Sequence, residues 1–128
     1  MADKKILYVD DEIHILHLMR IKLQKNGFKV ITADNGEGAF ELAVLEKPDI
    51  IISDVQIPIM TGIEFVKKLQ TKEETKNIPV ILITGEYLNI SSRQLKSLNV
   101  KRLFSKPFNP REVMEAIEYI ICAKTLHK

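Results

Sequence analysis

Short apolar runs alternate with longer amphipathic stretches along the whole chain, and this alternation constrains the fold more than any other feature. The pattern predicts βαβ units around a parallel sheet, because each apolar run is the length of a buried strand and each longer stretch has helical periodicity. Three of the runs are apolar throughout, as expected of strands that are covered on both faces. The predicted strands are residues 6–9, 28–32, 50–53, 80–83 and 102–104.

Five helices are predicted between and after these strands. The first carries apolar residues at helical spacing and is followed by Gly27, a residue that favours a helix end. The second ends before Pro48, because the residue before a proline disfavours helical backbone. The last opens at Asn109 with proline at the next position, a capping residue followed by a residue suited to the first turn. The predicted helices are residues 12–26, 36–46, a segment from 62, residues 89–98 and a segment from 110.

Some helix residues are expected to face the core. In the first helix these are Ile15, Leu18, Met19 and Leu23, and in the last helix Cys122 is predicted to lie in or near the core. His14 and His17 are three positions apart, a spacing that could place both on one side of the helix. Without a carboxylate partner, a solvent-exposed position is more probable for them than a metal site.

Length and composition exclude several classes of protein. The chain has 128 residues, 45% of them hydrophobic and 28% charged, which is typical of one compact domain spanning residues 1–128. A net charge of +2 is too small to indicate direct nucleic-acid binding. The first apolar run is too short for a signal peptide or membrane insertion, and the single cysteine cannot form an intrachain disulfide. We therefore expect a cytoplasmic location.

Polar residues stand directly after four of the predicted strands. In a parallel α/β sheet, ligands bind at the carboxyl ends of the strands, so these residues are expected to converge on one edge. Clustered carboxylates repel one another unless a cation neutralises them, and hard oxygen ligands are those that Mg²⁺ takes. The segments are Asp10-Asp11-Glu12, Ser53-Asp54, Thr84-Gly85 and Ser105-Lys106-Pro107.

This arrangement predicts phosphoryl transfer. Asp54 would be the nucleophile and would form an acyl phosphate, while Lys106 and Thr84 would contact the phosphoryl oxygens. Taken singly, each residue is more often a helix cap, a turn residue or a solvated side chain. The occurrence of all of them after four different strands favours the functional interpretation.

The sequence resembles the receiver domain of two-component response regulators over essentially its whole length. The resemblance rests on Val9-Asp10-Asp11-Glu12, on Asp54 followed by Ile57-Pro58, Met60 and Gly62, on Thr84-Gly85, and on Lys106-Pro107-Phe108. It implies a flavodoxin-like (βα)5 three-layer sandwich with a parallel five-stranded sheet in the order 2-1-3-4-5.

The resemblance also implies roles for individual residues. Asp54 would be the phosphoacceptor, and Mg²⁺ would be held by Asp11, Asp54 and the backbone carbonyl of Gln56, with Asp10 acting largely through water. Thr84 and Lys106 would contact the phosphoryl group, a cis bond before Pro107 would aim the lysine, and Gly85 would leave room for the phosphoryl group to enter.

Partners follow from the same resemblance. A sensor histidine kinase or a phosphotransfer protein would donate the phosphoryl group. A downstream protein would bind the surface made by the fourth helix, fifth strand and fifth helix, and the chain would be a monomer or a phosphorylation-dependent dimer.

Two positions depart from the family pattern. Leu103 stands where the family usually has an aromatic residue that turns inward on phosphorylation. Glu86 puts an acid two positions after Thr84, and we hypothesise that it slows or redirects attack by water. Dephosphorylation of Glu86→Ala tests this, and an unchanged half-life would contradict it.

Three alternative functions are weighed. A haloacid-dehalogenase-like phosphatase would need a D-x-D motif after the first strand and a cap domain. A flavin-binding module would need a loop rich in Ser, Thr and Gly there, whereas the loop is acidic. A phosphorylation-independent pseudo-receiver that only binds partners stays open because of Leu103.

Overall fold

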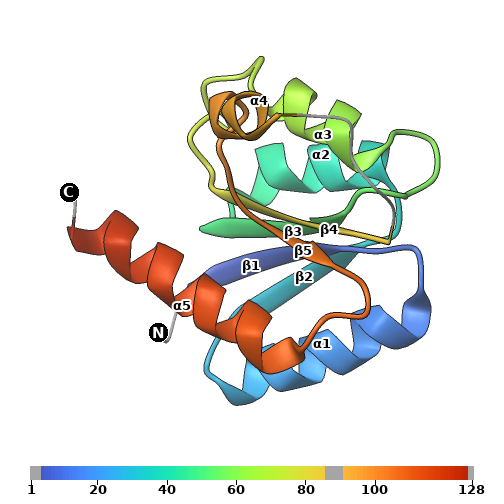
Figure 1. Ribbon diagram of the computed structural model, residues 1–128, viewed down its shortest axis with the longest axis vertical. Helices are drawn as coiled ribbons and strands as arrows, with labels where there is room; N and C mark the ends of the chain where they lie inside the picture. The colour runs from blue at the N-terminus through green and yellow to red at the C-terminus, as the bar shows by residue number, and fades with distance from the viewer. Residues whose placement is uncertain (1–3, 86–90, 127–128) are drawn as a thin grey trace.

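The computed structural model describes residues 4–85 and 91–126 and consists of five strands and five helices in strict alternation. Figure 1 shows the sheet in the middle, with α1 and α5 on one face and α2, α3 and α4 on the other. The strands are β1 (Lys5–Val9), β2 (Lys29–Ala33), β3 (Ile50–Asp54), β4 (Val80–Thr84) and β5 (Val100–Ser105). The helices are α1 (Ile13–Lys25), α2 (Gly36–Glu46), α3 (Gly62–Leu69), α4 (Ser92–Ser97) and α5 (Pro110–Leu126).

All neighbouring strands are parallel and their order is β2-β1-β3-β4-β5, which confirms the predicted topology. The pairing of β1 with β3 joins Val9 to Ser53, and the pairing of β4 with β5 joins Thr84 to Ser105. These registers bring the carboxyl ends of the strands to one edge of the sheet, where the predicted polar residues follow.

The three central strands, β1, β3 and β4, are buried on both faces, and the side chains of β1 alternate between the two halves of the core. Ile6 and Tyr8 lie in the cluster under α1 and α5, whereas Leu7 and Val9 lie in the cluster under α2 and α3. All four are at most 1% exposed. This double burial explains why the runs read as continuously apolar.

Local signals fix the ends of several helices. The Thr61 side chain accepts a hydrogen bond from the Glu64 amide, and the Glu64 carboxylate accepts one from the Thr61 amide, which makes a capping box at the start of α3. Gly27 adopts a φ of 91° directly after α1, a backbone conformation that favours glycine. At the start of α5, the Asn109 side chain accepts from the Arg111 amide.

Several predicted boundaries shift by a few residues. The second strand begins and ends one residue later than predicted, and β5 is longer because a register shift at Val80 lets it begin at Val100. The structure begins α4 at Ser92, and residues 89 and 90 of the predicted helix lie outside the described residues. Among the described residues, no helix combines the length and the apolar character needed to cross a bilayer.

Two predictions of burial are wrong. Leu18 is 43% exposed because α1 is apolar on more than one side, and only one stripe of it can face the sheet. Cys122 is exposed because it lies on the side of α5 that carries the exposed Glu118 and Tyr119, whereas the neighbouring Ile121 faces the core.

Candidate functional site

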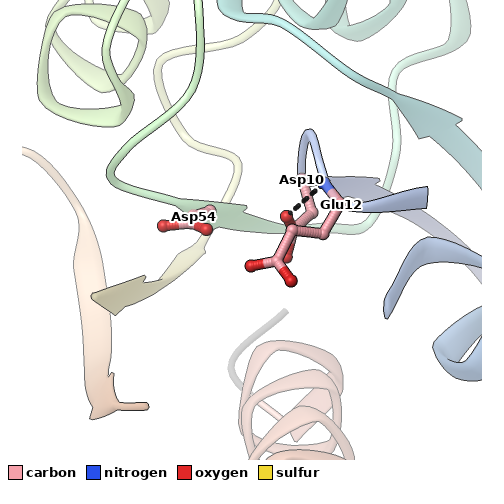
Figure 2. A group of neighbouring side chains, drawn as sticks. All are labelled: Asp10, Glu12 and Asp54. Carbon is pink, nitrogen blue, oxygen red and sulfur yellow. Dashed lines mark hydrogen bonds between the residues drawn. The ribbon is translucent and has the colours of Figure 1, made fainter. Parts of the chain in front are cut away.

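The loop after β1 turns its first carboxylate into the protein. Asp10 is 1% exposed, and its amide donates to the carbonyl of Ala33 in the neighbouring strand at 3.1 Å. The Glu12 amide donates to Asp10 Oδ1 at 2.9 Å, which closes the turn into α1. Figure 2 shows this bond and the Glu12 side chain pointing toward the same space as Asp10 and Asp54.

Asp54 is the last residue of β3 and is 3% exposed. Its Oδ1 accepts a hydrogen bond from the Gln56 amide at 3.0 Å. The loop then folds back so closely that a Cβ on Gly62 would lie 2.6 Å from the Asp54 carbonyl oxygen. Glycine at position 62 therefore permits the tight packing of α3 beneath the acceptor.

Lys106 brings a positive charge to these carboxylates from the loop after β5. The Lys106–Pro107 peptide bond is cis, as the resemblance implies, and the Lys106 amide donates to the carbonyl of Thr84 at 2.8 Å. Its Nζ lies 2.6 Å from Asp54 Oδ2, 3.1 Å from Glu12 Oε1 and 3.9 Å from Asp10 Oδ2.

Burial, together with nearby charges and hydrogen bonds, shifts the pKa of three groups. Burial raises the pKa of Asp10 to about 6, and the charges of Asp54 and Glu12 act in the same direction against the Glu12 amide and Lys106. Burial disfavours the ammonium form of Lys106, but its bonds to Asp54 and Glu12 outweigh this and raise its pKa. Burial, followed by the charges of Asp10 and Asp54, raises the pKa of Tyr8 beneath the site.

The donor set fits Mg²⁺. One carboxylate oxygen from each of Asp10, Glu12 and Asp54 lies within 4.8 Å of the others. These are hard oxygen ligands of the kind that Mg²⁺ takes, and at this separation the three carboxylates repel one another when they are ionised. A divalent cation would remove this repulsion.

The structure gathers most, but not all, of the predicted site residues. Asp11 is exposed and, among the described residues, does not belong to the carboxylate group that could hold a metal. Gly85 lies beside the site. A Cβ added at this position would be 3.8 Å from Gln56 Oε1 and 3.9 Å from Lys106 Cδ. Glu86 lies outside the described residues.

The two remaining predicted residues are placed by strand position. Thr84 is the last residue of β4 and is 4% exposed. Leu103 is 39% exposed on β5, whereas the neighbouring Phe104 is buried and lies under the guanidinium of Arg102 at 4.7 Å. Phe104 therefore belongs to the core cluster under α1 and α5.

Sequence reasoning assigned no role to Glu12. The only available signal was its position as the third consecutive acid after β1, which gives no indication of side-chain direction.

A cavity of about 410 Å³ opens beside the site. Glu12 and Ile15 line it from the start of α1, and Lys106 lines it from the opposite loop. The remaining lining residues are Leu18, Gly85, Pro107, Phe108 and Pro110. Of the three carboxylates, Glu12 lines the cavity, and Lys106, which contacts Asp54, lines it from the other side.

A family model described as the response regulator receiver domain matches residues 6–118. The chain belongs to this family. It is 37% identical over 119 residues to the alkaline phosphatase synthesis transcriptional regulatory protein PhoP of Bacillus subtilis, covering 93% of this chain and 49% of that protein. It is 33% identical over 125 residues to sporulation initiation phosphotransferase F of the same organism, covering 98% and 99%. The chain thus spans about half the length of the first relative and nearly all of the second.

Solved receiver structures agree with the fold. The chemotaxis response regulator CheY4 of Vibrio cholerae matches with a TM-score of 0.82 and 34% identity, covering 91% of this chain and 98% of that one. The receiver domain of a Pseudomonas aeruginosa sensor histidine kinase, solved with a magnesium ion in its active-site cleft, has a TM-score of 0.82 and 22% identity, covering 94% and 98%. Receiver domains are signalling switches that bind Mg²⁺ at an acidic site and interact with histidine kinases and downstream partners.

Proposed function

We propose that this receiver is a phosphoacceptor in a two-component phosphorelay and that Asp54 receives the phosphoryl group. The observation that carries this proposal is the Lys106 ammonium 2.6 Å from a carboxylate that is 3% exposed at the end of β3. A carboxylate held in this way beside a cavity can act as a nucleophile, and the lysine is placed to meet charge that develops on the phosphoryl oxygens.

The reaction balances without an oxidant or a reductant. A carboxylate oxygen of Asp54 attacks phosphorus and forms a new P–O bond, while the P–N bond to the donor histidine breaks. The imidazole leaves with the electron pair and takes a proton from solvent. The product is an acyl phosphate on Asp54.

The other site residues take supporting roles in this proposal. The family resemblance assigns Mg²⁺ to Asp11, Asp54 and the carbonyl of Gln56, with Asp10 acting largely through water. Asp10 and Asp54 already belong to the carboxylate group, whereas the exposed Asp11 side chain would have to turn toward it when the ion binds. The bound ion would supply positive charge that offsets the charge of the transferring group. Thr84 and Lys106 would contact the phosphoryl oxygens after transfer.

Two surfaces are assigned to partners. The donor histidine, from a sensor histidine kinase or a phosphotransfer protein, would approach through the 410 Å³ cavity, whose wall includes Ile15 and the exposed Leu18. A downstream protein would bind the α4-β5-α5 surface, where Lys101, Arg102 and Leu103 are exposed. Phosphorylation would change binding there by shifting a conformational equilibrium.

Intact mass after incubation with acetyl phosphate, with and without Mg²⁺, tests the acceptor. The parent protein should gain the mass of one phosphoryl group only with Mg²⁺. Asp54→Asn should gain none, and the matched Asp34→Asn in an exposed neighbouring loop should behave like the parent. Absence of an adduct on the parent, even with rapid sampling, would instead favour the pseudo-receiver, which Leu103 at the switch position already makes the second candidate.

A further inference from the structure

The Glu12 side chain stands at the start of α1, where it could cap the helix, but it does not. It is the N-cap residue of α1, with φ −86° and ψ 106°, and among the described residues its side chain makes no capping hydrogen bond. Side chains at this position usually accept a bond from the first turn of the helix. The Glu12 carboxylate instead reaches Lys106, 94 positions away in the sequence, at 3.1 Å.

This ion pair joins the two sides of the cavity beside Asp54. Glu12 comes from the start of α1 and Lys106 from the loop before α5, and both line the cavity. The Lys106 side chain is 23% exposed, so the pair lies between the buried Asp54 and solvent. The ammonium is therefore shared between the acceptor and a second carboxylate nearer the surface.

Sharing has a consequence for phosphoryl transfer. A phosphoryl group on Asp54 needs the same ammonium, so the Lys106 contact with Glu12 competes with the contact that transfer requires. We propose that Glu12 is a positioning residue that holds Lys106 while Asp54 is unmodified and thereby slows phosphorylation by anionic donors. The expected change in phosphorylation rate rests on the proposed function, whereas the contact between Glu12 and Lys106 does not.

The size of the effect follows from exposure. Glu12 is 60% exposed, so its contact with Lys106 is screened by water. Ion pairs of this kind change an equilibrium by about two- to fivefold. We expect the second-order rate constant for phosphorylation of Glu12→Gln to exceed that of the parent by this factor.

The kinetic test follows intact mass over time after acetyl phosphate is added. The Mg²⁺ concentration that saturates the site is determined for each variant first. Glu12→Gln should be faster at low donor concentration, whereas Glu37→Gln, which removes an exposed charge from the start of α2, should match the parent. Glu12→Asp keeps the charge but shortens the side chain, so it should behave like Glu12→Gln. A Glu12→Asp rate equal to the parent rate would overturn the contact in favour of a general field effect.

A second test needs no phosphorylation. Urea unfolding in EDTA of the parent, Glu12→Gln, Lys106→Met and the double variant measures the coupling between the two residues. A favourable coupling of about two- to fivefold in the unfolding equilibrium supports the ion pair. No coupling would overturn the inference. If coupling is present but the parent protein takes up no phosphoryl group, then the proposed function has failed while Glu12 still positions Lys106.

Discussion

Replacement of Asp10 by asparagine should stabilise the metal-free protein. Asp10 is 1% exposed, and its pKa is raised from the ordinary 3.8 to about 6. At 1.36 kcal/mol per pKa unit, this difference corresponds to about 3 kcal/mol of destabilisation when the group is ionised. Asparagine has nearly the same shape, carries no charge and can still accept the bond from the Glu12 amide.

The effect has a definite pH dependence. The folded pKa of Asp10 lies above the unfolded one, so the folded state holds the proton more tightly. Below pH 3.8 both states are protonated and the two proteins differ little. Between pH 3.8 and about 6 the parent loses stability as pH rises, and above that range the loss is complete. The advantage of Asp10→Asn should therefore be full at pH 7.5 and small at pH 4.

Urea unfolding in EDTA measures this difference. With a slope of roughly 1–3 kcal/mol per molar urea, the midpoint of Asp10→Asn should rise by about 1–3 M at pH 7.5. Asp11→Asn removes the same charge from an exposed neighbour and should shift the midpoint much less. Mg²⁺ should stabilise the parent more than Asp10→Asn, because it binds the more acidic site more tightly. An equal or lower midpoint for Asp10→Asn at pH 7.5, or an advantage that persists unchanged at pH 4, would refute the reasoning.

Three further substitutions test local packing, backbone conformation and hydrogen bonding. Gly62→Ala should cost about 1–3 kcal/mol and impair phosphorylation, because its Cβ would lie 2.6 Å from the Asp54 carbonyl oxygen, whereas Gly38→Ala, whose nearest contact is 3.4 Å, should be tolerated; equal effects in urea unfolding would contradict this. Ile59→Gly should stabilise by about 0.5–1 kcal/mol, since Ile59 has a φ of 71° and is 76% exposed, and a lower urea midpoint would speak against stored strain. Thr75→Val should cost about 1 kcal/mol by urea unfolding, because the buried hydroxyl donates to the last carbonyl of α3 at 2.6 Å, and no loss would mean that the bond contributes nothing.

The sequence alone predicted the alternation of strands and helices and most of their bounds. Residues 36–46 form a helix as predicted, and α3 and α5 begin at Gly62 and Pro110. These features depend on local physics: apolar periodicity, capping side chains and the backbone limits of glycine and proline. The expectation that polar residues after the strands meet at one edge follows from parallel topology and is seen in the contacts of Lys106 with Asp10 and Asp54.

Tertiary structure decided which side chains are buried at the margins of the core. Leu18 was expected to face the core, yet it is 43% exposed, and Cys122 lies on the exposed side of α5 opposite the buried isoleucines. Apolar character alone does not say how wide a stripe of a helix the core covers, since Met19 and Ile121 are buried beside these two exposed residues. Exposure at the edge of a helix therefore depends on the length and placement of neighbouring strands.

Tertiary structure also decided which acid points into the site. Asp10, Asp11 and Glu12 are consecutive, and sequence reasoning favoured the first two. In the folded protein Asp11 is exposed, while Glu12 meets Lys106 at 3.1 Å. The direction of a side chain in a turn depends on the backbone and on partners that approach from distant parts of the chain. Here that partner is Lys106, placed by the loop after β5. The local sequence determined how many carboxylates follow β1, and the fold determined which of them face the site.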